Sequence, residues 1–507
     1  MLTFAPTNHK PKSMLRKTVL FSLFLIHFIS FSQEIVREFD LKLESKRDFF
    51  QVVNKNNKEI ILFSNDKEKV SSIRFDEKFN IKDSLSTIRP DKDYTEIIGY
   101  SQNEDDYFIF WGSKDRKEIN CQYFNFAKKE TKSTPINLEL KKEKIVKELT
   151  IGNVFYLITI VKNTNVLKFY ISDAHGNLNE KTIDLSHLEF KNIFNRPENL
   201  YRVMTDESYD PAFQTISGDS PPSLALSAKK YKIYTHNPDE IIFSIDNTAN
   251  ATQVLRINLH DFTPNFKYIL QPNTVKGEYG AIDFRSNSFI IDNKILQLKT
   301  NSFVFFFTVS DFDGNKIKEF KVFHDKEIDF KNSDFFEENG STENKKVILN
   351  TEKFLRKIHN FPSISCYNLN GTYTVIGSSV DKYYENILPV IGAMPHAGIG
   401  MGNGGLVPVS YGTCHTVENL ISYRGKFVVY TNCLFDSNFN HIDEKLETSA
   451  FEKARIFLEE NKDIRENLLI FKNNLYKDLI VFKFNKNLYL GNYNKQNKKY
   501  QIFSFTE

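Results

Sequence analysis

Residues 154–177 read VFYLITIVKNTNVLKFYISDAHGN, and this segment decides the fold. Two runs rich in Val, Ile, Phe and Tyr, Val154–Val161 and Val166–Ser172, flank a short polar gap and end in the turn Asp173–Asn177. Such runs, bounded by Asn, Asp and Gly, are typical of β-strands. An Asp that closes a strand accepts hydrogen bonds from backbone N–H groups two residues on, while Gly and Asn tolerate the left-handed conformation that reverses the chain. The segment predicts paired strands and a tight turn into a third strand.

The same ending recurs along the chain. Aromatic or β-branched runs end in an Asp, three arbitrary residues and an Asn at Asp76 and Asn80, Asp173 and Asn177, Asp261 and Asn265, Asp311 and Asn315, and Asp436 and Asn440. Looser versions occur at Asn125 and Lys129 and at Asn494 and Lys498. Positions 76, 125 and 173 are about fifty residues apart, and so are positions 261 and 311. A period of this length, with a strand on each side of a tight turn, indicates a radially repeated β fold.

We therefore expect an all-β protein, a β-propeller spanning residues 33–507. Seven four-stranded blades fit the spacing best, and six or eight remain open. Two intervals exceed the period, and we interpret them as insertions rather than degenerate blades. The region 187–227 contains four prolines, among them Pro211, Pro221 and Pro222, which cannot donate to a central strand, and the region 325–350 is dense in Lys, Glu and Asn. The expected insertions cover about 186–228, 324–362, 379–414 and 442–463.

One short helix is predicted near residues 449–460. Ser449 and Glu452 form a capping box, and apolar residues with helical spacing follow at Phe451, Ala454, Phe457 and Leu458. The helix precedes the last repeat, so we expect it to pack on the propeller.

The beginning of the chain has the pattern of a signal peptide, residues 1–32, with Met14 as the alternative start. A basic cluster, Met14–Lys17, precedes the apolar stretch Thr18–Ile29, and small residues follow, so we expect cleavage between Ser32 and Gln33. The apolar stretch is too short for a comfortable membrane span, and no stable span is expected after cleavage. These features predict export to the periplasm, the cell surface or the medium.

The charge balance limits the classes of partner that we expect. The full chain has 67 Lys and Arg against 64 Asp and Glu; removing the four basic residues of positions 1–32 leaves 63 against 64. The charges are interspersed, so no nucleic-acid partner is expected, and we expect a monomer.

Of the four cysteines, Cys121 has a strand pattern typical of a buried free thiol. Export permits a disulfide between two of Cys366, Cys414 and Cys433.

A glycine-rich segment, Gly392–Gly412, reads GAMPHAGIGMGNGGLVPVSYG. It contains a Gly-x-Gly-x-x-Gly match, but Leu406-Val407-Pro408 follows and cannot open the helix that a dinucleotide site needs. The segment is either a flexible insertion or a partner-contact loop. The candidate contact residues of the second interpretation are Met394, His396, Ile399, Met401 and Leu406.

The remaining motifs do not support a catalytic or metal-binding site. Residues 217–220 contain a Gly-Asp-Ser that resembles a block of lipases with a flavodoxin-like fold, but the Asp184–His187 block precedes the serine instead of following it. Residues 311–315 match the opening of a calcium loop, yet position 322 is Val rather than Glu. Cys414, His415 and His396 lack the paired spacing of a zinc site. We therefore expect no catalytic residues, no cofactor and no metal.

Over residues 35–507 the repeats resemble β-propeller repeat proteins in general, and exported propeller-like proteins of Gram-negative bacteria in particular. The Trp-Asp dipeptides of WD40 repeats and the kelch glycine signature are missing, so the resemblance implies a fold and no activity. We expect a non-enzymatic binding or scaffold protein of the cell envelope with a protein or glycan partner. The alternative is an exported hydrolase or lyase with an active site in the central funnel.

The repeat pattern also predicts which face binds. If the Asp-x-x-x-Asn turns join third and fourth strands, the long insertions all project from the opposite face. The predicted partner site lies on that face, around Met394–Leu406.

Overall fold

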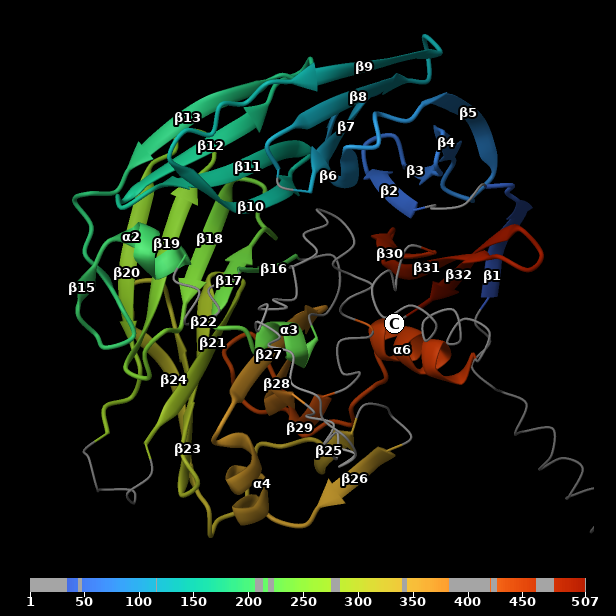
Figure 1. Ribbon diagram of the computed structural model, residues 1–507. Helices are drawn as coiled ribbons and strands as arrows, with labels where there is room; N and C mark the ends of the chain where they lie inside the picture. Colours follow the sequence, from blue (N-terminus) through green and yellow to red (C-terminus); the bar gives the residue numbers. More distant parts are fainter. Residues whose placement is uncertain are drawn as a thin grey trace, which may run out of the picture.

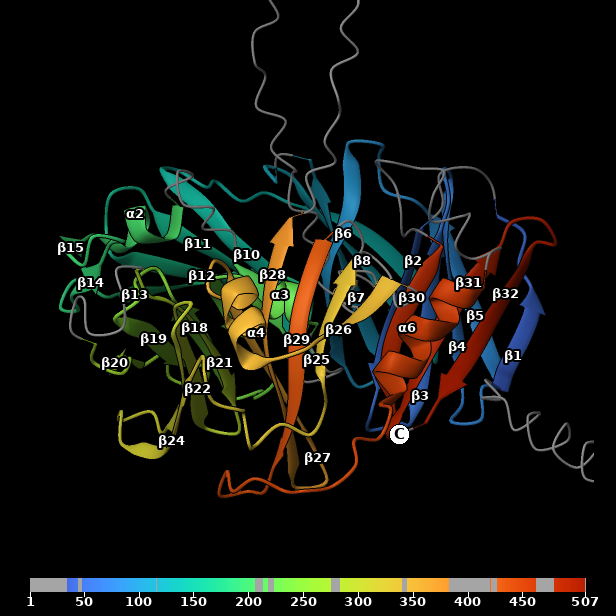
Figure 2. The ribbon, with the colours of Figure 1, turned by 90° about the horizontal axis from the view of Figure 1, so that it is seen from below.

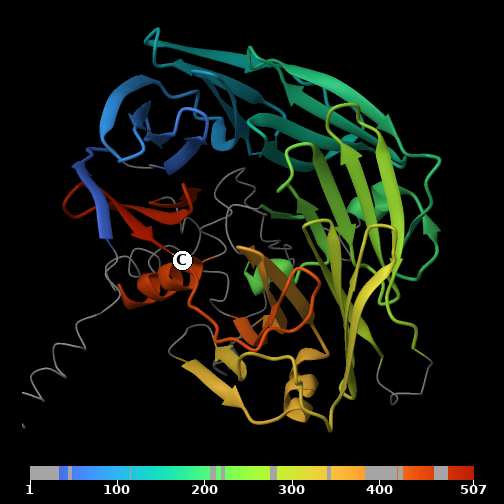
Figure 3. The same cartoon turned by 180° about the vertical axis from the view of Figure 1, so that it is seen from behind.

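The computed structural model describes residues 34–43, 48–114, 116–205, 213–217, 223–274, 283–339, 344–382, 420, 426–461 and 478–506. Seven predominantly antiparallel sheets stand around one axis and form a β-propeller (Figure 1; Figure 3 shows the ring from behind). The expected seven blades are confirmed. Among the described residues, no helix combines the length and apolar character needed to cross a membrane.

The blades are numbered along the chain. Blade 1 contains β2 (Asp48–Asn54), β3 (Glu59–Asn65), β4 (Lys69–Phe75) and β5 (Ile81–Ile88), and blade 2 contains β6 (Tyr94–Asn103), β7 (Asp106–Ser113), β8 (Ile119–Asn125) and β9 (Glu130–Ile136). Blade 3 contains β10 (Glu143–Ile151), β11 (Val154–Val161), β12 (Val166–Ser172) and β13 (Leu178–Asp184). Blade 4 contains β17 (Tyr231–Tyr234), β18 (Glu240–Ile245), β19 (Ala251–Asn258) and β20 (Pro264–Leu270), and blade 5 contains β21 (Arg285–Ile291), β22 (Lys294–Thr300), β23 (Val304–Ser310) and β24 (Lys316–Phe323).

Blades 6 and 7 are assembled from distant segments. Blade 6 has the strand order β26 (Lys345–Ile348), β25 (Phe335–Asn339), β29 (Lys426–Phe435), β28 (Thr372–Lys382) and β27 (Pro362–Leu369). Blade 7 combines β30 (Leu479–Phe484), β31 (Asn487–Asn494) and β32 (Lys499–Phe505) with the outermost strand β1 (Glu34–Asp40). The β1–β32 pair therefore joins the two ends of the described chain.

The two faces of the ring differ in their connections. Antiparallel neighbours place the links between first and second strands and between third and fourth strands on one face, which we call the turn face. The links between second and third strands, and those between blades, lie on the opposite face, which we call the loop-rich face (Figure 2). The predicted contact residues Met394, His396, Ile399, Met401 and Leu406 lie outside the described residues, between β28 and β29. These are a second and a third strand, so the ends that flank the segment reach the loop-rich face.

The predicted turns share one geometry, which blade 1 illustrates. Oδ1 of Asp76 accepts hydrogen bonds from the backbone N–H groups of Lys78 and Asn80 (2.9 and 2.8 Å), and Oδ2 accepts from the Asn80 side-chain amide (3.0 Å). The hydrogen bonds from Asn80 hold the pKa of the Asp76 carboxyl below its usual value. The Asn at the fifth position is therefore a double donor to the Asp that closes the strand.

Three other turns repeat this arrangement. Asn177 donates its backbone N–H and its side-chain amide to Asp173 (2.9 and 3.1 Å). Asn315 donates the same two groups to Asp311 (both 2.9 Å), and Asn440 donates them to Asp436 (2.8 and 2.9 Å). These asparagines have a structural role within their turns, as the sequence pattern predicts.

Two of the predicted turn pairs nevertheless differ from expectation. Asn265 lies inside β20 opposite Arg256, and the strand-end acceptor of this turn is Asn258, whose Oδ1 accepts from the N–H groups of His260 and Asp261. The prediction that Asp261 pairs with Asn265 is wrong, because the turn begins three residues earlier. Oδ1 of Asp261 accepts instead from the backbone N–H and the hydroxyl of Thr263 (2.9 and 2.7 Å).

The second difference concerns Asp436 and Asn440. Asp436 closes β29, a third strand, but the fourth position of blade 6 is occupied by β25 from an earlier part of the chain. Asn440 therefore completes a turn that does not lead into a fourth strand, whereas Asn315 directly precedes the fourth strand β24. The assignment of every such turn to a third–fourth hairpin is wrong for this pair.

The expectation that every long insertion projects from one face is also wrong, because β25 takes the fourth position of blade 6. Part of segment 324–362 supplies strands β25 and β26 and the helix α4 (Thr351–Ile358). The segment after Asp436 begins on the turn face and leads into α6 (Ala450–Glu460). This helix is the one predicted, since Oγ of Ser449 accepts from the Glu452 backbone N–H, and its apolar side packs on blade 7.

The fourth position of the turns is a contact between blades. Its φ is positive at Phe79 (61°) and Gly176 (78°). Phe79 is 3% exposed and packs on three aromatic rings of the neighbouring blade 7, Phe482, Phe484 and Tyr489. Gly176 has no side chain, and the Phe108 ring of the preceding blade occupies the corresponding space. A Cβ added at Gly176 would lie 2.6 Å from this ring. At these two junctions, the aromatic ring comes from the turn in one case and from the neighbouring blade in the other.

Apolar clusters span six of the seven junctions, and an ion pair bridges the junction between blades 6 and 7. Arg455 of α6 donates to both carboxylate oxygens of Glu338 on β25 (3.0–3.1 Å), and the Tyr430 hydroxyl donates to Glu338 Oε1 (2.6 Å). The side chains of Glu338 and Arg455 are both buried. Helix α6 thus fills the gap between the last two blades (Figure 1).

Cys121, Cys366 and Cys433 are buried free thiols, which confirms the prediction for Cys121. Cys366 and Cys433 both stand opposite Val375, on the two sides of β28. Two strand spacings separate their Cα atoms by roughly 9.6 Å, beyond the ~7 Å limit for a disulfide. A bridge between these two is excluded, so the predicted disulfide requires Cys414, which lies outside the described residues.

Thiol labelling tests this arrangement. Burial raises the pKa of Cys121 to about 12. At pH 8 its thiolate fraction is then about three orders of magnitude below that of an ordinary cysteine, and the thiolate is the reactive form. We expect Cys121 to resist iodoacetamide in the folded protein and to react at once after denaturation. Rapid labelling of folded protein at Cys121, or a Cys121 crosslink in a non-reducing peptide map, would contradict this.

Candidate functional site

A short hairpin and a helix rise over the loop-rich face beside blade 4. The hairpin pairs β14 (Phe190–Lys191) with β15 (Pro197–Glu198), and α2 (Leu200–Thr205) follows. Both belong to the segment between β13 and β17, which starts and ends on this face because it links two blades.

The hairpin tip repeats the turn of the blades. Oδ1 of Asn192 accepts from the backbone N–H groups of Phe194 and Arg196 (3.0 and 3.1 Å), as the Asp oxygen does elsewhere. The fourth position, Asn195, again has a positive φ of 58°. The turn fixes the backbone on both sides of Phe194, whose ring is 67% exposed. A large apolar side chain is therefore held in solvent by a rigid support.

Two buried amides attach this hairpin to blade 4. The Gln253 side chain accepts from the Lys191 N–H and donates to the Lys191 carbonyl (both 2.9 Å). The Asn247 amide donates to the same carbonyl (2.8 Å), and its oxygen accepts from Gln253 (2.9 Å). The stem of the hairpin is further held by Phe190, which packs on Phe266 with 4.7 Å between ring centroids. The hairpin is thus a fixed wall.

A cleft of about 210 Å³ lies between this wall, α2 and the end of blade 4. It is lined by Asn192, Ile193, Phe194, Glu198, Arg202, Val203, Tyr231 and Asn247. The exposed Arg202 guanidinium stands 3.9 Å from a carboxylate oxygen of Glu198. Beside the cleft, Lys191 Nζ lies 4.6 Å from the Tyr268 ring centroid, and burial raises the pKa of Tyr268 to about 12. The cleft therefore offers donors, acceptors and apolar surface together.

The centre of the ring is occupied by the same inserted segment. Strand β16 (Gln214–Ile216) pairs in parallel with β17, and α3 (Leu224–Ser227) packs on blade 6, where Ser363 Oγ donates to the Leu224 carbonyl (3.1 Å) (Figures 1 and 3). On the other side of the ring, Lys147 Nζ donates to the Phe213 carbonyl (3.1 Å). The described parts of the segment are thus tied to blade 3 at Phe213 and to blade 6 at Leu224.

Two carboxylates from neighbouring blades share one arginine. Glu96 and Glu148 come from the first strands of blades 2 and 3, and Arg116 forms ion pairs with both. Within the described ranges, no group of three or more His, Cys, Asp or Glu side chains has the arrangement of a metal site. The contact between His260 and Asp239 (2.9 Å) is exposed on the turn face.

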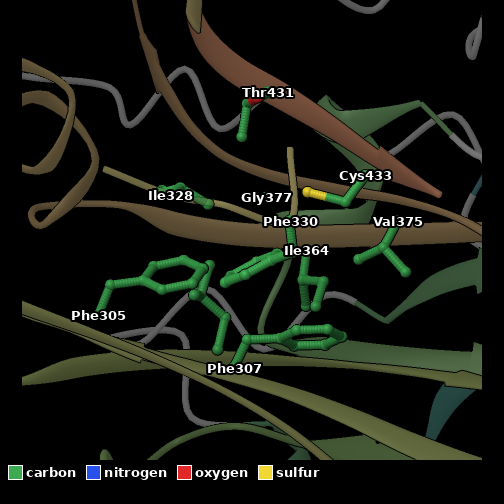
Figure 4. Close-up of a pocket in the computed structure, with 10 residues that line it drawn as sticks. Phe305, Phe307, Ile328, Phe330, Ile364, Val375, Gly377, Thr431 and Cys433 are labelled. Atoms are coloured by element: carbon green, nitrogen blue, oxygen red, sulfur yellow. The ribbon is translucent and has the colours of Figure 1, made fainter. Parts of the chain in front are cut away.

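A second cavity is closed and apolar. It measures about 10 Å³ and lies between blades 5 and 6, where Phe305, Phe307 and Phe330 surround it (Figure 4). A cavity of this size barely admits one water molecule, and an apolar lining gives a water no partner. It is a packing gap between blades.

The cleft has no clear signal in the sequence. The strands of its hairpin are two residues long, which is too short for a strand pattern. The available signal was the turn itself, since Asn192-x-x-x-Arg196 repeats the looser Asn-x-x-x-Lys pattern of the blades.

No family model matches the chain, and no curated protein matches it. Solved structures that resemble it include an apocarotenoid oxygenase variant from Synechocystis (7% identity, TM-score 0.28, 56% of this chain and 62% of that chain) and a prolyl endopeptidase (6%, 0.31, 68% and 40%). AofleA from Arthrobotrys oligospora also matches (8%, 0.24, 68% and 83%). The chain spans less than two thirds of the length of the first two. At these values the likeness carries no functional argument, and the fold rests on the strand order.

Proposed function

We propose that this protein is an exported, non-enzymatic binding protein of the cell envelope that recognises its partner through the loop-rich face. The observation that carries the proposal is the cleft at residues 192–203, where a rigid turn exposes Phe194 beside Arg202 and Glu198. The apolar stretch Thr18–Ile29, preceded by basic residues, supports export.

The exposed aromatic side chains support the same face. By their positions at strand ends or in connections, the large apolar side chains exposed on the loop-rich face are Ile88, Phe194, Leu270, Phe303, Phe323 and Phe361. Those near the turn face are the aliphatic residues Ile35, Ile81 and Ile317, each near the start of a fourth strand. Aromatic rings are enriched in the cores of binding interfaces, and exposed apolar surface with a polar surround is typical of interaction sites.

The alternative, a hydrolase or lyase centred in the funnel, has less support. It requires acids and bases with free catalytic oxygens or nitrogens, whereas Glu96 and Glu148, from the first strands of neighbouring blades, both form ion pairs with Arg116. The segment through β16 and α3 also takes up room at the axis.

Capture from envelope extracts tests the proposed face. We expect Phe194→Ser to lower recovery of the captured partner at least about tenfold. A central aromatic residue contributes more binding free energy than the residues at the rim of an interface. The matched control is Ile317→Ser, an exposed apolar residue on the turn face. Since the Phe194 ring is largely exposed, the substitution is expected to leave the free energy of unfolding within about 0.5 kcal/mol of the parent. Equal recovery by the two variants would contradict the assignment.

A further inference from the structure

We infer that the cleft at residues 192–203 binds one neutral sugar ring, as the terminal unit of a glycan. This inference rests on the proposed function, since it assigns a ligand class to the same face.

The charge of the cleft is balanced. Its lining contains one cation, Arg202, and one anion, Glu198, with 3.9 Å between Nη1 and Oε2. An anionic ligand bound to Arg202 would be repelled by the nearby Glu198 carboxylate. A cationic ligand bound to Glu198 would in turn be repelled by the Arg202 guanidinium. A neutral ligand with many hydroxyl groups can instead donate to the carboxylate and accept from the guanidinium, because each hydroxyl is both donor and acceptor.

The local hydrogen bonds hold this carboxylate in place. Oε1 of Glu198 accepts from the backbone N–H and the side-chain amide of Asn199 (both 3.1 Å). The other oxygen, Oε2, is the one that faces Arg202. The carboxylate is therefore oriented before a ligand arrives, which lowers the entropy cost of binding.

The amide of the hairpin tip adds a donor. In the blade turns, the carboxylate oxygen Oδ2 of the Asp is satisfied by the Asn four residues on. In the hairpin, Asn192 carries a nitrogen at the corresponding position, and Arg196 stands four residues on. Asn192 Oδ1 is engaged by the turn, so its Nδ2 is the part of the side chain that remains to donate into the cleft. A ring with several hydroxyl groups uses such dispersed polar contacts.

The lip of the cleft supplies an apolar platform. The C–H face of a sugar ring is apolar and carries partial positive charge, which suits the negative face of an aromatic ring. Phe194 is exposed and its backbone is held by the Asn192 turn, so little backbone freedom is lost when a ligand stacks on the ring. Ile193 and Val203 complete the apolar lining.

The size of the cleft limits the ligand to a small group. The volume of about 210 Å³ is below the ~300 Å³ at which drug-sized sites begin. One six-membered ring fits this space, with the rest of a glycan extending into solvent. A folded protein partner would instead need a broad, flat contact area.

Saturation-transfer NMR with purified protein tests the ligand class directly. The probes are methyl glycosides of glucose, galactose, mannose, fucose and N-acetylglucosamine, with glucuronic acid and glucosamine as charged probes. We expect at least one neutral glycoside to bind with a millimolar or lower Kd, and the charged probes to bind at least about tenfold more weakly. Phe194→Ala and Arg202→Met are each expected to weaken binding about tenfold or more, and Ile317→Ala is expected to leave it unchanged.

The outcomes separate this inference from the proposed function. The sugar inference is overturned if no neutral glycoside gives a signal at about 10 mM, a concentration that exceeds a millimolar Kd roughly tenfold. Binding that ignores both cleft variants overturns it as well. If envelope capture of a protein still depends on Phe194 in that case, the loop-rich face remains the binding face with a protein partner. If capture also ignores Phe194, both assignments fail.

Discussion

Replacing Glu338 with Leu while Arg455 remains is expected to lower the free energy of unfolding by about 3–5 kcal/mol. The two side chains are 0% and 3% exposed, and removal of the carboxylate leaves the guanidinium buried without its main counter-ion. The Tyr430 hydroxyl loses its acceptor in the same substitution, and burial beside Glu338 already raises the pKa of Tyr430 far above its usual value. Chemical denaturation followed by fluorescence and circular dichroism measures the loss.

The matched control is the double variant Glu338→Leu with Arg455→Met. A buried ion pair replaced on both sides by apolar groups is often neutral in stability, so the double variant is expected to recover most of the loss. Additive losses from Glu338→Leu and Arg455→Met would show that the pair is not coupled and would contradict the role assigned to α6 at the junction between blades 6 and 7.

Replacing Phe79 with Ala is expected to cost about 3–5 kcal/mol, as for other large-to-small changes at buried rings. The ring is buried and its centroid lies 4.8 Å from that of Tyr489 across the junction between blades 1 and 7. Phe79→Gly leaves the same cavity but removes the strain of a positive φ, so it is expected to be about 1 kcal/mol less damaging than Phe79→Ala. Thermal and chemical unfolding of both variants checks the difference.

The reference variant is Phe194→Ala, since Phe194 is a turn residue whose ring is exposed. It is expected to change stability by no more than about 0.5 kcal/mol. A loss below about 1 kcal/mol for Phe79→Ala would mean that the turn ring does not seal the blade junction.

The repeat could be predicted because most blades carry a local chemical signal. The carboxylate of Asp76, Asp173 or Asp311 needs only its own turn for its hydrogen bonds, so the residue pattern alone locates the end of a third strand. Helix α4 was not predicted although its signal is also local, with Asn350 as the cap and Phe354, Leu355 and Ile358 on one side. The dense charges of the preceding residues gave that segment the composition of a loop.

Other features have no local signal. Strand β25 pairs with β29, about ninety residues further on, and nothing in residues 335–339 marks it as the outer strand of a later blade. For the same reason the pattern at Asp436 and Asn440 predicted a hairpin that the assembled blade does not contain. The cleft likewise depends on the position of the β14–β15 hairpin. Gln253 and Asn247 of blade 4 hold this hairpin, and they come close to it only in the folded ring. The contact role of Met394–Leu406 stays a prediction.

The pairing of β1 with β32 also dictates a sequence of assembly during synthesis. Lys499 and Glu38, which form a hydrogen bond of 2.5 Å in the completed blade, are 461 residues apart. The first strand leaves the ribosome early and has no partner until almost the whole chain has been made, whereas blades 1 to 5 can form from neighbouring residues. At ≈ 5–20 residues per second, this wait lasts tens of seconds. The ring therefore closes only when the last strand of the described chain is available.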